Sequence, residues 1–334
     1  MKYFDSIDLY RAIGVFFVFL YHSVWIFDSM IDCVIGPHIY FITALMWSGV
    51  NLFFLASGFI NGKQFINTKS TSLFLISRAK RIFPLYYLYL TIGTCLFMYG
   101  NTFFYIDNYN LIYQYLFLSG VDFFNENLGH PAYFCITWSL SVEIQLYLIT
   151  FFIIKFANKS TIRICLGLSL IGLFTPYLHA NHFGLIMHLD EYFVGVLLRT
   201  LYNTGILQSL IIKWICITGL FISALILPNI ELTQGNPLLD SVLLLIYSSI
   251  LILLLNFKFN IHKSLLEIGK NCYFIYLFHM LFIYMFLKFL NNNGINPIIS
   301  LCIAFVFCYF FSIISKIFFE SIFYRKLNDH PSEQ

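Results

Sequence analysis

The segment Asp8-Leu-Tyr-Arg11-Ala-Ile-Gly-Val-Phe-Phe-Val-Phe-Leu-Tyr-His22 decides the fold class, because it is an apolar run of helical length that carries two ionisable side chains. The spacing of Arg11 and His22 puts them within about 20° of one helix face and about 16 Å apart along its axis. An ionisable residue inside a membrane span costs roughly 3 kcal/mol, which makes such residues functional candidates. The segment therefore predicts a membrane helix that presents a cation and an imidazole on one face.

The composition of the whole chain supports this class. The chain has 334 residues, of which 60% are hydrophobic and 10% are charged, with a mean hydropathy of +0.81. Soluble domains are usually about 25% charged. Only helices and closed barrels satisfy their backbone in lipid, and long continuous apolar runs exclude the alternating pattern of barrel strands. We expect an all-α, polytopic membrane helix bundle that forms a single domain over residues 1–334.

About ten transmembrane helices are expected, since each apolar segment approaches the roughly 20 residues that cross a bilayer. The expected ranges are 8–27, 39–61, 73–99, 134–156, 162–178, 184–202, 209–227, 237–257, 271–290 and 297–319. Outside the spans, Lys and Arg fall on one side, and only Lys288 lies near the other face. By the positive-inside rule both termini are cytoplasmic, as an even number of spans requires.

The cysteines and the remaining histidines give no metal signature. Most of the eight cysteines lie in expected spans without zinc or redox spacing, which favours a role as small apolar fillers. Cys33 and Cys135 lie near the same face, so a disulfide between them stays open. A polar group around the outer end of the sixth span also fits no standard metal spacing. Its members are His179, His182, His188, Asp190 and Glu191. We expect no metal.

The fourth expected span carries a carboxylate at the depth that His22 reaches. Ser139 and Glu143 are four residues apart and share a helix face, which Tyr147 extends. A carboxylate that meets an imidazole in a low-dielectric bundle would orient it and raise its basicity, as in an activated general base. The alternative is a buried pair that only holds two helices together. Depth matching leaves both interpretations open.

Two further segments allow a packing and a functional interpretation. Ser57 and Gly58 in the second span favour close helix packing, because small residues let helices approach. The basic run that contains Arg78 and Arg81 is explained by positive-inside placement alone. Together with Arg11, which enters from the same side, these arginines would also suit the phosphates of an acyl donor.

Five segments, in order along the chain, resemble the acyltransferase-3 family of integral-membrane acyltransferases. They are Arg11 and His22 with ten residues between them, Gly-Val-Asn-Leu-Phe-Phe-Leu-Ala-Ser-Gly-Phe at 49–59, Arg78-x-x-Arg81 followed by Pro84, Trp-Ser-Leu-Ser-Val-Glu at 138–143, and Tyr-Leu-Phe-His at 276–279. The resemblance covers essentially the whole chain. Asn51 replaces an Asp that is common in the family, which puts an acidic role there in doubt.

The resemblance implies a role for each matching residue. His22, Arg11 and Glu143 would be catalytic, with His22 central to acyl transfer. Arg11, Arg78 and Arg81 would bind the donor, acetyl-CoA. The remaining polar and aromatic residues of the matching segments would bind the acceptor: Asn51, Trp138, Ser139, Ser141, Tyr276 and His279.

The resulting hypothesis is a multi-pass O-acetyltransferase of the bacterial inner membrane. It would move acetyl from cytoplasmic acetyl-CoA to a sugar hydroxyl of an envelope glycan, such as a surface polysaccharide or a lipopolysaccharide O-antigen. Nucleic acid is not an expected partner. Two alternatives remain: a transporter or flippase of lipid-linked sugars, since buried Arg, His and Glu also suit proton coupling, and a structural subunit of a polysaccharide-export complex.

Overall fold

The computed structural model describes residues 5–31, 45–65, 71–99, 108–118, 134–156, 160–178, 184–233, 236–257, 260–291 and 293–319. All regular elements in these ranges are helices, which confirms the all-α class. They are α1 (Asp5–Ile31), α3 (Gly49–Asn61), α4 (Thr71–Met98), α5 (Asn108–Tyr115), α6 (Thr137–Phe156), α7 (Thr161–Phe174), α8 (Leu189–Asn203), α9 (Leu210–Ile226), α10 (Pro237–Asn256), α11 (Lys263–Lys270), α12 (Cys272–Asn291) and α13 (Pro297–Phe319), with short 3₁₀ turns between some of them.

Each of the ten expected spans contains a helix, but the described residues hold six candidate spans that are long and apolar enough to cross a membrane. These are Asp5–Ile26, Phe134–Phe156, Leu210–Asn229, Pro237–Asn256, Cys272–Phe289 and Ile298–Ile317. The protein is therefore a multi-pass membrane protein, whereas the count of ten stays a prediction. Both chain ends and Cys33 lie outside the described residues, so the cytoplasmic termini and the disulfide also stay predictions.

The clearest differences from the expected ranges concern α3 and two short helices. Residues 39–44 of the second expected span lie outside the described residues, and α3 begins at Gly49, after a turn at residues 47–48 in which the Ser48 hydroxyl donates to the Leu45 carbonyl at 2.6 Å. Two short helices, α5 and α11, were not expected at all. Neither has the length of a membrane span, which is why a search for long apolar segments misses them.

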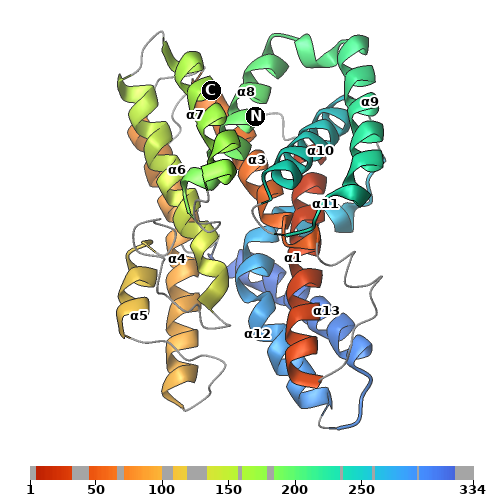
Figure 1. Cartoon of the computed structure of the whole chain (residues 1–334). Coiled ribbons are helices and arrows are strands. Elements are labelled where there is room, and N and C mark those ends of the chain that lie inside the picture. The colour runs from red at the N-terminus through yellow and green to blue at the C-terminus, as the bar shows by residue number, and fades with distance from the viewer. Residues whose placement is uncertain are drawn as a thin grey trace.

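Helix α1 occupies the centre of the bundle. It contacts α3, α10, α11, α12 and α13, and Figure 1 shows it beside α12, with α4 and α5 on one side of the molecule and α9 on the other. Two buried apolar clusters meet along it. One contains Val15, Val18 and Phe19 of α1, and the other contains Ile7 and Tyr10. The helix that carries Arg11 and His22 is therefore enclosed by protein along much of its length.

Helices α3 and α8 pack with their backbones in contact, and two glycines make this possible. A Cβ atom added at Gly58 would lie 1.9 Å from the carbonyl oxygen of Tyr192, and one added at Gly195 would lie 2.2 Å from that of Leu55. Any larger residue would push the helices apart. The packing interpretation of Gly58 is thus confirmed, and the approach brings Tyr192 beside the polar end of α3.

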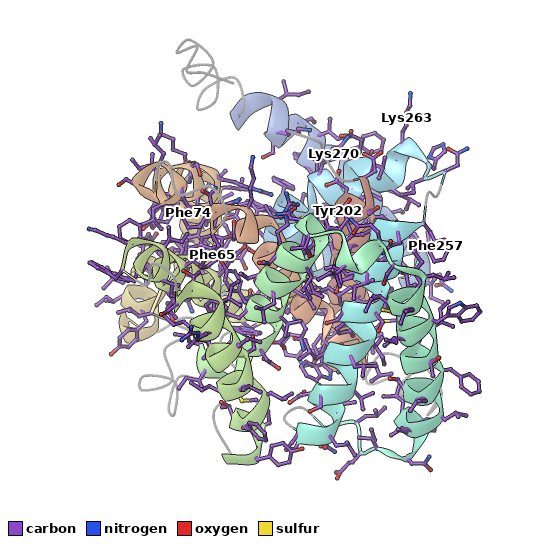
Figure 2. All side chains as sticks on the ribbon, turned by 90° about the horizontal axis from the view of Figure 1, so that it is seen from above. Phe65, Phe74, Tyr202, Phe257, Lys263 and Lys270 are labelled. Carbon is purple, nitrogen blue, oxygen red and sulfur yellow. The ribbon has the colours of Figure 1, made fainter. Side chains whose placement is uncertain are left out.

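The short helix α11 forms a basic edge of the molecule. Figure 2 shows Lys263 pointing away from the ribbon, with Lys270 nearer the helices. The Lys270 ammonium donates to Glu267 at 2.8 Å, and Lys316 of α13 lies 3.9 Å from the same carboxylate. The hydrogen bond from Lys270 holds the pKa of Glu267 below its usual value. Because these side chains are partly exposed, the ion pairs position α11 and add little stability.

We predict that Gly58→Ala lowers the free energy of unfolding by about 1–3 kcal/mol, since the new methyl group overlaps the α8 backbone. Gly167→Ala is the matched control: a Cβ atom there has no atom within 4 Å, and alanine improves helix propensity by up to about 1 kcal/mol. Thermal unfolding in detergent measures both. Equal melting temperatures for the two variants would contradict the close α3–α8 contact.

Candidate active site

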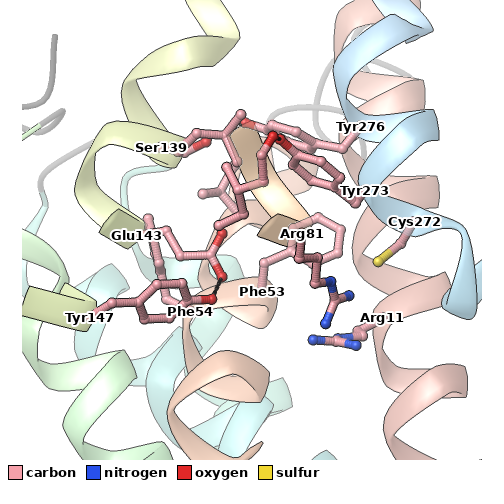
Figure 3. Close-up of a pocket in the computed structure, with 13 residues that line it drawn as sticks. Arg11, Phe53, Phe54, Arg81, Ser139, Glu143, Tyr147, Cys272, Tyr273 and Tyr276 are labelled. Carbon is pink, nitrogen blue, oxygen red and sulfur yellow. Dashed lines mark hydrogen bonds between the residues drawn. The ribbon is translucent and has the colours of Figure 1, made fainter. Parts of the chain in front are cut away.

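A cavity lies where α1, α3, α4, α6 and α12 meet. It mixes cations, a carboxylate, hydroxyl groups and aromatic rings, as a site for a polar ligand with an apolar arm would. Figure 3 shows ten of its residues labelled. The lining residues are Arg11, Val50, Phe53, Phe54, Arg81, Ile82, Ser139, Leu140, Glu143, Tyr147, Cys272, Tyr273 and Tyr276.

Arg11 of α1 and Arg81 of α4 form the cationic end of this cavity. Their guanidinium groups point toward the same part of the pocket, from two different helices (Figure 3). Two like charges raise each other's energy in a low-dielectric interior, so an anion between them would offset the repulsion. Guanidinium groups also match phosphate oxygens with paired hydrogen bonds. The two arginines thus have the chemistry that suits an anionic group.

Glu143 of α6 is held by two hydroxyl groups. Its Oε1 atom accepts hydrogen bonds from the Ser57 hydroxyl, at 2.9 Å, and from the Tyr147 hydroxyl (Figure 3). Ser57 comes from α3 and Tyr147 from the next turn of α6, so the carboxylate is fixed from two sides. The hydrogen bond to Glu143 makes Ser57 part of the site, in addition to the helix-packing role that the sequence favours.

Arg78 reaches Glu143 indirectly, through a chain of hydrogen bonds. Its Nη2 donates to Asn61 Oδ1 at 2.6 Å, and Asn61 Nδ2 donates to the Ser57 hydroxyl at 3.3 Å. Asn61 Nδ2 also lies 3.2 Å from the Tyr192 hydroxyl. The Arg78 guanidinium lies over the Tyr147 ring as well, 5.6 Å from its centroid. Arg78 therefore supports the carboxylate, whereas Arg81 lines the cavity.

His22 meets a second imidazole. Its Nδ1 atom lies 3.1 Å from Nε2 of His279 in α12, and the ring centroids are 4.9 Å apart. We expected Glu143 to meet His22, but the structure gives each of them other partners. The reason is the direction of α6, whose carboxylate faces α3 and the arginine side of the cavity. The partner that orients His22 is an imidazole from a helix far away in sequence.

Tyr276 lies between the cavity and the histidine pair. Its hydroxyl is 2.6 Å from the Ser139 hydroxyl and 3.1 Å from the carbonyl of Ile136. Its ring packs against the His279 ring, with centroids 5.9 Å apart, and it also lines the cavity. Tyr276 thus lines the cavity and packs on His279, whereas His22 and His279 are not among the residues that line it.

The other expected acceptor residues lie outside the lining of the cavity. The Trp138 ring packs on His188, with centroids 5.2 Å apart. The Ser141 hydroxyl donates to the Thr137 carbonyl at 3.3 Å, a bond within its own helix. Asn51 is buried in α3. Roles for these three in acceptor binding stay predictions.

The structure adds residues that sequence reasoning missed. Asn61 is four residues after Ser57, on the same helix face, and this spacing was an available signal. Tyr273 and Cys272 line the cavity from the start of α12. Nothing in their spacing distinguishes them from the many other aromatic and small residues in the apolar segments.

One comparison with known proteins identifies the family of the chain. A family model described as an acyltransferase domain, Acyl_transf_3, matches residues 4–317, nearly the whole chain. No curated protein and no solved structure matches it. A match of this extent covers the arginines, the carboxylate and both histidines of the site. The chain therefore belongs to the acyltransferase-3 family and is a membrane acyltransferase.

Proposed function

We propose that this protein is an O-acetyltransferase of the bacterial inner membrane that moves acetyl from cytoplasmic acetyl-CoA to a sugar hydroxyl of an envelope glycan. The observation that carries the proposal is one cavity with two arginines at one end and, in its wall, Tyr276, whose ring packs on His279 of the histidine pair. The arginines suit the anionic part of a donor, and an imidazole suits a hydroxyl that must lose its proton. Acetyl is the acyl group that members of the family commonly transfer. The glycan acceptor is the one that the resemblance to the family implies.

Arg11 and Arg81 bind the donor phosphates in this proposal. The cavity walls offer Phe53, Tyr273 and Cys272 to the thioester arm, which runs from the arginines toward Tyr276. His22 takes the proton of the sugar hydroxyl. In the direct route, the sugar oxygen bonds to the acetyl carbon, the carbon–sulfur bond breaks, and the proton passes from His22 to the thiolate.

In a second route, Nε2 of His22 bonds to the acetyl carbon as the carbon–sulfur bond breaks; the sugar oxygen then displaces His22, and the hydroxyl proton passes to the thiolate. Rapid-quench mass spectrometry without an acceptor distinguishes the routes. Acetylated protein in the wild type but not in His22→Gln supports the covalent route, and its absence supports the direct one.

The first prediction concerns the glycan. Cells with the wild type should carry surface glycan with an added acetyl mass, and His22→Ala should remove that mass because the hydroxyl keeps its proton. Mass spectrometry of the glycan measures this. His262→Ala is the control, since His262 is exposed at the start of α11. A glycan of unchanged mass but reduced surface amount would instead favour a transporter of lipid-linked sugars. Unchanged mass and amount would favour a structural subunit.

The second prediction separates the two arginines of α4. Arg81→Gln should raise KM for acetyl-CoA by about 10–100-fold, since it removes a hydrogen bond to a charged group. Arg78→Gln should lower kcat and leave this KM unchanged, because Arg78 acts through Asn61 and Ser57 on Glu143.

A double-mutant cycle checks the hydrogen-bond chain. Asn61→Leu should lower kcat in the wild type and have a much smaller effect in Arg78→Gln, because either change already breaks the chain. Fully additive effects would contradict it. The same assays on the membrane-inserted proteins, with expression measured in parallel, separate loss of function from loss of protein.

A further inference from the structure

We propose that His279 is the positioning residue of His22: it accepts a hydrogen bond from the Nδ1–H group of His22 and holds the ring in place, so that His22 presents the lone pair of Nε2 to the reacting hydroxyl. The proposal deepens the proposed function and rests on it. It replaces the expected carboxylate partner of His22 with a neutral one.

Two backbone carbonyls determine where the ring protons lie. Nδ1 of His279 is 2.6 Å from the carbonyl oxygen of Tyr276, and Nδ1 of His22 is 3.0 Å from that of Val18. A carbonyl oxygen only accepts hydrogen bonds, so each Nδ1 atom must carry the hydrogen. The opposite tautomer would place two lone pairs face to face at both contacts.

The contact between the rings then has one direction. With its hydrogen on Nδ1, neutral His279 has a lone pair on Nε2, and this atom is 3.1 Å from Nδ1 of His22. The single Nδ1–H hydrogen of His22 is therefore shared, in a three-centre hydrogen bond, between the Val18 carbonyl and Nε2 of His279. The remaining nitrogen of His22, Nε2, carries a lone pair on the other side of the ring.

The surroundings keep His279 in this position. The residue is 1% exposed, and its ring packs against Phe19 and Tyr276, with centroid distances of 6.4 and 5.9 Å. Burial prevents water from competing for the lone pair of Nε2. Because neutral imidazole carries no charge, this partner avoids the penalty of a second buried anion near the site.

In this arrangement His22 can take up the hydroxyl proton and release it again within one reaction cycle. When Nε2 of His22 takes the proton of the hydroxyl, positive charge develops on the His22 ring, and Nε2 of His279 accepts a stronger hydrogen bond from Nδ1. The charge is thus shared between two rings while the oxygen attacks. The proton returns from His22 Nε2 to the leaving sulfur, so neither histidine is consumed.

Kinetics of two variants test the positioning role. His279→Leu removes the acceptor and should lower kcat by about a hundredfold or more, with KM for acetyl-CoA unchanged. His279→Gln places an amide oxygen near the position of Nε2, can still accept from His22, and should stay within about tenfold of the wild type. His262→Leu, at the exposed histidine of α11, is the control for the substitution itself.

Nitrogen-15 NMR of histidine-labelled protein gives a readout that needs no acyl transfer. The signals lost in His22→Gln and in His279→Gln identify the two rings, and both should show a protonated Nδ1. A protonated Nε2 on neutral His279 would overturn the proposal, as would wild-type kcat in His279→Leu. Equal losses in the Gln and Leu variants, with both inserted, would also overturn it. A wild type that transfers no acetyl refutes the proposed function, and the NMR result then still decides the tautomer.

Discussion

A polar group inside a lipid-embedded bundle must find its partners within the protein, and the site depends on this constraint. No water is at hand to satisfy a buried guanidinium, amide or imidazole. Arg78, Asn61, Ser57 and Glu143 accordingly form one connected chain from α4 through α3 to α6. His22 and His279 form a second group that joins α1 to α12. The polar groups that suit catalysis are therefore also the contacts that tie the helices together.

The close packing of α3 and α8 shows how the scaffold serves the site. Gly58 and Gly195 let the two backbones touch, which brings the Tyr192 hydroxyl to Asn61 and to Thr150 of α6. Without that contact the amide of Asn61 would have room to turn, and its oxygen would no longer be held toward Arg78. The two glycines at the α3–α8 contact thus help to fix the Asn61 amide, which bonds to Arg78 of α4.

Much of the fold could be read from the sequence, because lipid leaves few structural choices to a chain of this composition. The site was predicted in part. Arg11, Arg81, Ser139, Glu143 and Tyr276 do line one cavity. Depth along a span can be counted in residues, but the direction in which a helix faces its neighbours depends on packing. For this reason the partner of His22, which is 257 positions away, could not be found from spacing.

The hydrogen-bond chain from Arg78 to Glu143 also has a bioenergetic consequence. A membrane that stores a proton gradient loses energy through any continuous file of groups that can both take up and release protons. The amide of Asn61 interrupts such a file, because its nitrogen donates hydrogen bonds without accepting a proton. The chain thus holds its carboxylate in place, and the Asn61 nitrogen offers no lone pair through which a proton could pass from Ser57 toward Arg78.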